Sequence, residues 1–159
     1  METVLQIAAV CLVGAVLAAV LRQRSPEAAL LLGQPYETLP AGEAGLREIT
    51  ERLSLGGRRS VVLTGASLAP GRTGAVCFDA RTGKTEAVQT AYVAHEFHGT
   101  GDVFSSVLTG ALVRGESLSS AAGEAAAFVR ACAERTAAED LPMREGVDFE
   151  PLLGRLAEK

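Results

Sequence analysis

HGTGDVFSSVLTGALV, residues 98–113, is the stretch that decides how this chain is interpreted. Two glycines, Gly99 and Gly101, let the backbone approach an anion closely, and the apolar residues that follow recur at helical spacing. The free amides of a helix N-terminus, strengthened by the helix dipole, favour negative charge. The stretch therefore predicts a phosphate-binding turn that opens a helix.

Asp102, directly after this turn, has two interpretations. An aspartate in the first turn can cap the free amides, which stabilises a helix by about 0.5–2 kcal/mol. The same carboxylate beside a bound phosphate can instead accept a proton as a general base. The spacing alone leaves both open.

Composition indicates one ordinary globular domain joined to a more apolar segment. The chain has 159 residues and a net charge of -4, and it shows no basic face. It has no tryptophan, and only 4% of its residues are aromatic. Nucleic acid is therefore not an expected partner, because both phosphate neutralisation and base stacking lack the residues they need.

Cysteine and histidine usage gives no metal or disulfide framework. Cys11, Cys77 and Cys132 are far apart, odd in number and not arranged as CxxC, which is typical of small buried residues in a reducing compartment. His95 and His98 are three residues apart without a nearby cysteine, so a zinc site is not expected.

The N-terminus is almost continuously apolar over residues 4–21, which at about 1.5 Å per residue is just long enough to span a bilayer. This predicts a membrane helix, and Arg22 and Arg24 after it place the rest of the chain in the cytoplasm. The alternative is a buried or oligomerising helix, because Gly14 and Ala18 form a small-xxx-small pair.

The remainder alternates helix and strand, as an α/β layered domain does. Residues 59–64 form a short apolar strand, expected within a parallel sheet. Residues 73–79 and 84–93 flank the connection 80–83 and predict a β-hairpin. Helices are predicted around Leu46 to Leu53 and over residues 100–114, 118–136 and 150–157, and Asp148 and Glu150 are expected to face solvent or cap the last helix.

Longer stretches resemble a known family in order along the chain. HGTGDVFSSVLTGALVRGESL (98–118) is similar to the signature of pyridoxal and pyridoxamine kinases of the ribokinase superfamily. Further stretches similar to that family are SVVLTG (60–65), GAVCFDARTGK (74–84), EAALLLGQPY (27–36) and GVDFEPLL (146–153). The resemblance covers about residues 27–159, which corresponds to the C-terminal half of a family member.

This resemblance implies a partial ribokinase-like α/β fold, with parallel strands, a β-hairpin and C-terminal helices, in residues 25–159. Residues 1–24 would be the apolar helix before it, a membrane tether for a cytoplasmic kinase-like part. The implied activity is ATP- and Mg²⁺-dependent phosphorylation of the 5′-hydroxymethyl group of pyridoxal, pyridoxamine or pyridoxine, the salvage of vitamin B6 to pyridoxal 5′-phosphate. Kinases of this kind are commonly homodimers.

The family's site residues carry over by position. The resemblance implies that Asp102 is the catalytic base that accepts the proton of the substrate hydroxymethyl group. It also implies an anion hole for the transferring phosphoryl group, formed by Gly99, Thr100 and Gly101.

Two further positions are implied more weakly. Thr64 and Gly65, at the end of a predicted strand, would contact nucleotide phosphates. Glu27 would hold Mg²⁺ through water. The family has an asparagine three residues before this glutamate and the chain has Arg24, which puts the magnesium role in doubt.

The family's N-terminal half, which holds most of the vitamin, has no counterpart in this chain. Loss of substrate orientation alone can remove about 7–11 kcal/mol of barrier lowering. The isolated chain is therefore expected to be an inactive portion of a kinase. A half-sheet would also expose an unpaired edge, which favours pairing with another chain.

Other families remain as alternatives. Hydroxymethylpyrimidine kinases commonly have cysteine where Asp102 stands, and sugar kinases usually have alanine at the Thr100 position. The opening VLQIAAVCLVGAVLAAVLRQRSPEAALLL (4–32) is similar to the first membrane segment of the stage III sporulation protein AD. The third alternative is therefore a hybrid chain, or a non-enzymatic membrane protein of a sporulation assembly.

Overall fold

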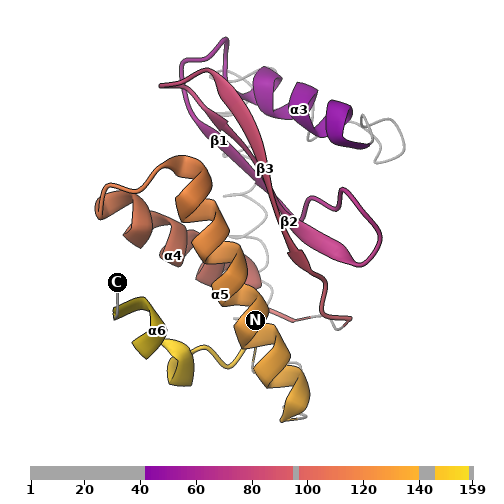
Figure 1. Cartoon of the computed structure of the whole chain (residues 1–159), viewed down its shortest axis with the longest axis vertical. Coiled ribbons are helices and arrows are strands. Elements are labelled where there is room, and N and C mark those ends of the chain that lie inside the picture. Colours follow the sequence, from indigo (N-terminus) through magenta and orange to yellow (C-terminus); the bar gives the residue numbers. More distant parts are fainter. Residues whose placement is uncertain (1–41, 95–96, 140–145, 158–159) are drawn as a thin grey trace, which may run out of the picture. The chain divides into compact units, whose positions relative to one another are not determined.

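The computed structural model describes residues 42–94, 97–139 and 146–157 (Figure 1). The predicted apolar helix at residues 4–21 and the proposed magnesium ligand Glu27 lie outside these residues. Among the helices that are described, none combines the length and the apolar composition needed to cross a membrane.

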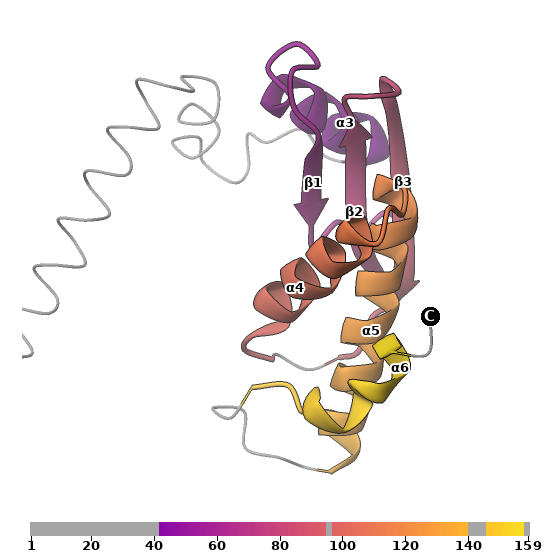
Figure 2. The ribbon, with the colours of Figure 1, turned by 90° about the vertical axis from the view of Figure 1, so that its left-hand side faces the viewer.

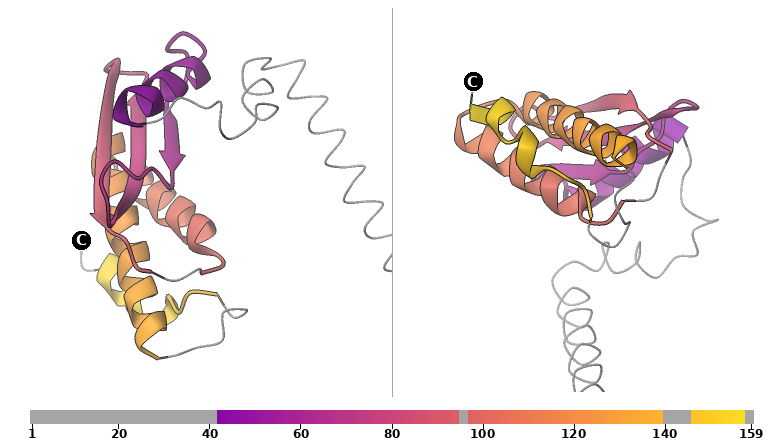
Figure 3. Two further views of the ribbon diagram at one scale, coloured as in Figure 1. Left: turned by 90° about the vertical axis from the view of Figure 1, so that its right-hand side faces the viewer. Right: turned by 90° about the horizontal axis from the view of Figure 1, so that it is seen from below.

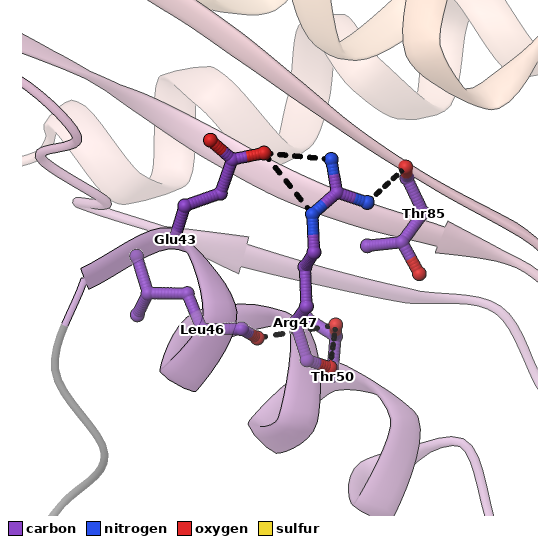
Figure 4. A network of polar contacts seen from close by, with 5 residues as sticks. All are labelled: Glu43, Leu46, Arg47, Thr50 and Thr85. Carbon is purple, nitrogen blue, oxygen red and sulfur yellow. Dashed lines mark hydrogen bonds and ion pairs between the residues drawn. The ribbon is translucent and has the colours of Figure 1, made fainter.

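Helix α3 (Gly42–Leu53) confirms the helical spacing around Leu46 to Leu53 and begins a few residues earlier. It buries Ile49 and Thr50 and is followed by residues with positive φ, Leu55 among them. Arg47 anchors the helix to the sheet: its Nη1 donates to the carbonyl oxygen of Thr85 at 2.7 Å, while Glu43 holds its other guanidinium nitrogens (Figure 4).

Among the described residues, the sheet contains three strands in the order β1-β2-β3: β1 (Val61–Thr64), β2 (Arg72–Asp79) and β3 (Lys84–Ala91). Strands β2 and β3 form the predicted hairpin, with Asp79 opposite Lys84 and Gly83 N–H donating to the Asp79 carbonyl at 2.8 Å. Strand β3 ends at Ala91, two residues before the predicted end at Val93.

The prediction of a parallel sheet is wrong for the described residues, because β1 pairs antiparallel with β2. An apolar four-residue strand fits either kind of sheet, so its composition could not decide. The connection over residues 65–71 decides instead. It is shorter than the dozen or more residues that a parallel crossover needs, so the chain reverses direction. In the described part of the chain β1 has β2 as its only strand partner.

Helices cover both faces of the sheet. Helix α3 packs against β1 and β2, and α5 (Leu118–Ala138) packs against β2 and β3 (Figures 2 and 3). The side chains of β2 alternate in a way that matches this arrangement. Ala75 and Cys77 belong to the core cluster beneath α5, whereas Val76 and Phe78, which alternate with them, are buried outside that cluster. The molecule is thus a layered α/β structure, as expected.

Helices α4 (Thr100–Val113) and α5 pack on each other and confirm the two helices expected after the glycine turn. Gly115, with φ of 93°, breaks the chain between them, and Ser117 caps α5 by accepting from the Ser120 amide. The last predicted helix is instead two short pieces, the 3₁₀ helix η3 (Glu150–Leu152) and α6 (Gly154–Ala157).

Candidate active site

The glycine turn opens helix α4, as the sequence predicts. Gly99 is the N-cap of α4 and adopts φ of 81°, a left-handed conformation that suits glycine. The first hydrogen bond of the helix runs from Val103 N–H to the Gly99 carbonyl at 3.0 Å. Within the described residues, the amides of Gly99, Thr100, Gly101 and Asp102 therefore have no hydrogen-bond partner. Four donors are available to an anion.

Asp102 is not the cap of this helix. It is the third helical residue, and no side chain caps α4. Its backbone carbonyl accepts from Ser106 Oγ at 2.8 Å. Its carboxylate is exposed and has no hydrogen bond or ion pair to any other described residue. The hydrogen bond that the capping interpretation requires is therefore absent from the described residues. The carboxylate is left open to a ligand.

A cavity of about 300 Å³ joins two of the predicted motifs. Thr64 and Gly65, at the end of β1, line it together with Thr100 and Gly101 of the turn, although more than 30 residues separate the two pairs. The other lining residues come from β2, β3, the segment after β3, and helices α4 and α5: Thr73, Gly74, Thr90, Ala91, Tyr92, Val93, Phe97, Phe104, Ala126, Val129, Arg130 and Ala133.

This cavity also contains a charged residue that no motif in the sequence indicated. Arg130 is the one charged side chain in its described lining, and it forms an i,i+4 pair with Glu134 at 3.1 Å. The only signal in the sequence is that Ala126, Arg130 and Ala133 share one face of a helix. That spacing does not say which face meets a ligand.

A second cavity, of about 470 Å³, lies at the same turn and is lined by His98, Gly99 and Asp102. Its wall is completed by α4, by Phe128 of α5 and by the C-terminal residues Gly146, Val147, Phe149, Leu153 and Leu156. The N-terminus of α4 therefore borders two cavities, with Gly101 lining one and Asp102 lining the other. No sequence signal indicated that the C-terminal segment would form a wall here.

The far end of α4 is fixed by an ion-pair network. Arg114, which also lines the second cavity, contacts Glu124 at 2.9 Å and Glu116 at 3.3 Å. The pKa of Glu116 is lowered, mainly by the hydrogen bond from Ser120 and also by Arg114.

For metals, the described residues contain no group of three or more histidine, cysteine or acidic side chains that could hold an ion.

Comparison with known proteins identifies the family. A family model described as phosphomethylpyrimidine kinase matches residues 11–146, which is most of the chain. The chain belongs to the phosphomethylpyrimidine kinase family. The match begins inside the apolar N-terminal segment, and the comparisons give no support to the resemblance to a sporulation protein.

Solved structures agree with this family and with the ribokinase-like fold. A putative phosphomethylpyrimidine kinase from Bacteroides thetaiotaomicron (rhombohedral form) has 29% sequence identity and a TM-score of 0.72, over 80% of this chain and 43% of that protein. An orthorhombic form with pyridoxal gives 29% identity and a TM-score of 0.71, over 80% and 45%. Pyridoxal kinase from Lactobacillus plantarum has 27% identity and a TM-score of 0.65, over 81% and 45%.

The matches to solved structures are partial in length. The chain spans less than half of each of these structural relatives. A comparison with curated proteins gives no match.

Proposed function

We propose that this chain forms the nucleotide-binding part of a kinase that transfers the γ-phosphoryl group of ATP to the hydroxymethyl group of a B6 vitamer. One observation carries the proposal: Thr64 and Gly65 line the same cavity as Thr100 and Gly101. A strand end and a helix N-terminus that meet in this way are where α/β proteins bind phosphates. The polyphosphate would lie there, against the free amides of the turn.

The proposed reaction assigns a role to each residue of the turn. The oxygen of the substrate hydroxyl group attacks the γ-phosphorus, the bond from that phosphorus to the ADP oxygen breaks, and the hydroxyl proton passes to the Asp102 carboxylate. The amides of Gly99, Thr100 and Gly101 stabilise the negative charge on the transferring group. Asp102 suits the base because its carboxylate is exposed and has no partner among the described side chains.

Mg²⁺, which kinases of this family typically use, would neutralise charge on the phosphates. The free amides of the turn suit a phosphate and not a cation, so the donors described here fit the nucleotide and not the metal. Glu27, which the resemblance assigns to Mg²⁺, lies outside the described residues.

Two substrates fit this chemistry. A B6 vitamer is favoured by Asp102, because hydroxymethylpyrimidine kinases commonly have cysteine at this position, and by the relatives described as pyridoxal kinase and as a form with pyridoxal. Hydroxymethylpyrimidine is the second candidate, and the description of the matching family model favours it. Both are heteroaromatic alcohols that present a hydroxymethyl group.

The expected behaviour of the chain by itself is ATP binding without turnover. It matches less than half of its structural relatives, and we propose that the remaining part supplies most contacts to the alcohol. Without those contacts the hydroxyl is not held for attack, and positioning accounts for much of the rate of phosphoryl transfer.

The test measures ATP binding by calorimetry and Mg²⁺-dependent phosphorylation of pyridoxal, pyridoxine, pyridoxamine and hydroxymethylpyrimidine. Asp102→Asn is compared with Glu48→Gln, which changes an exposed carboxylate on α3. Turnover that disappears only in Asp102→Asn would establish the kinase chemistry and overturn the expected inactivity. ATP binding without turnover would support the proposal as stated. No ATP binding by the folded chain would refute it.

A further inference from the structure

The C-terminal segment contacts the glycine turn through its backbone. Val147 N–H donates to the carbonyl oxygen of His98 at 3.3 Å. Gly146, with φ of 77°, brings the two backbones together: a Cβ at this position would lie only 3.1 Å from the same oxygen. Figure 2 shows this segment, in yellow, next to the beginning of α4.

This contact sets the direction of a donor in the turn. A trans peptide unit is planar, and its C=O and N–H point in opposite directions. The His98 carbonyl and the Gly99 amide belong to one such unit. A hydrogen bond that holds the His98 oxygen toward Val147 therefore turns the Gly99 N–H away from the segment. Gly99 N–H is one of the free donors of the turn.

Helix α5 holds the C-terminal segment in place. Asp148 N–H donates to Thr136 Oγ1 at 2.9 Å, and the Thr136 hydroxyl donates to the Cys132 carbonyl at 2.8 Å. Arg135 Nε donates to Asp148 Oδ2 at 2.7 Å. Thr136 is 2% exposed, so its hydroxyl is satisfied entirely by these two protein contacts. Asp148 was expected to face solvent or cap a helix, but instead it joins the segment to α5.

We propose that Thr136 is a positioning residue for the anion-binding turn, acting through Asp148 and Val147. The proposal rests on the proposed function, since it assigns the turn to the phosphates of ATP. Thr136 lies outside the described lining of both cavities, so it acts without touching the nucleotide. Its hydroxyl holds Asp148, Asp148 keeps Val147 in place, and Val147 orients the peptide that presents Gly99 N–H.

The experiment uses the whole chain with Thr136→Val, which keeps the shape of the side chain and removes the acceptor for Asp148 N–H. Thr136→Ser restores the hydroxyl. Glu139→Gln is the matched control, because Glu139 pairs with the same Arg135 at 2.5 Å without contacting the segment. Two properties are measured: amide hydrogen exchange at Val147 and at residues 98–102, and affinity for ATP and for adenosine.

In Thr136→Val, exchange should rise both at Val147 and across residues 98–102. ATP affinity should fall about threefold to tenfold, as expected for one hydrogen bond, while adenosine affinity stays unchanged. Thr136→Ser should recover both properties, and Glu139→Gln should change neither. Equal losses for ATP and adenosine would indicate a general structural role and would overturn the proposal.

Faster amide exchange at Val147 with unchanged exchange at residues 98–102 would also refute the proposal. If the native chain binds no ATP, the proposed function fails, but the exchange measurement still decides the positioning role. Should Thr136→Val not fold, Asp148→Asn provides the second variant. It keeps the backbone donor to Thr136 and removes the charge that Arg135 holds, so it should raise exchange at the same residues to a smaller extent.

Discussion

Replacing Gly101 by alanine should separate folding from phosphate binding, because the two effects have opposite signs. Gly101 has an ordinary helical backbone, and no heavy atom lies within 4 Å of the position that its Cβ would occupy. The added methyl group therefore meets no obstacle in the protein. Alanine also restricts the unfolded chain, so the variant should be about 0.4–1 kcal/mol more stable than the native chain.

The same methyl group should block the anion. Gly101 lines the first cavity, and Cβ atoms of a helix tilt toward its N-terminus, which is the side where the free amides open. A phosphate oxygen displaced by the methyl group loses at least one charge-assisted hydrogen bond, which contributes roughly 1.5–3 kcal/mol. ATP affinity should therefore fall about tenfold or more.

The assay combines urea denaturation with calorimetric titration of ATP and of pyrophosphate. Gly110→Ala is the control: it lies in the same helix, and its Cβ would meet only the flexible end of Arg114 at 3.8 Å. It should raise stability without changing ATP affinity. Native ATP affinity in Gly101→Ala would refute the assignment of these amides to phosphate.

Three further predictions follow from the backbone and from the buried thiols. Gly99→Ala should lower the free energy of unfolding by about 1–2 kcal/mol, because φ of 81° disfavours a Cβ; an unchanged urea midpoint would contradict this. Gly74→Ala should destabilise the chain by about 1–3 kcal/mol or more, because its Cβ would lie 1.9 Å from the Val88 carbonyl oxygen, and loss of amide-exchange protection between β2 and β3 is the readout. Burial raises the pKa of the Cys77 and Cys132 thiols from 9.0 to about 11. Between these pH values the unfolded chain binds fewer protons than the folded chain, so the contribution of the thiols to the free energy of unfolding is fully present below pH 9 and should be lost as the pH rises to 11. In urea titrations, a chain with Cys77→Ala and Cys132→Ala should lose less stability over the same pH range.

Local signals in the sequence predicted most of the elements. The connection 80–83 indicated the hairpin, and Gly115 separated α4 from α5, because turn and break signals act within a few residues. The glycine turn was likewise predicted from Gly99 and Gly101. The choice between a cap and a free carboxylate at Asp102 depended on side-chain geometry, which spacing does not give.

By itself the sequence determined the order of helices and strands, the glycine turn that opens α4 and the family resemblance, because short-range periodicity and turn chemistry depend on neighbouring residues. The tertiary structure alone decided that Thr64 and Gly65 share a cavity with Thr100 and Gly101, and that Val147 reaches His98. Each of these depends on segments far apart in the chain. Such contacts arise from how the layers pack, and no local pattern of residues encodes which distant backbone groups will meet.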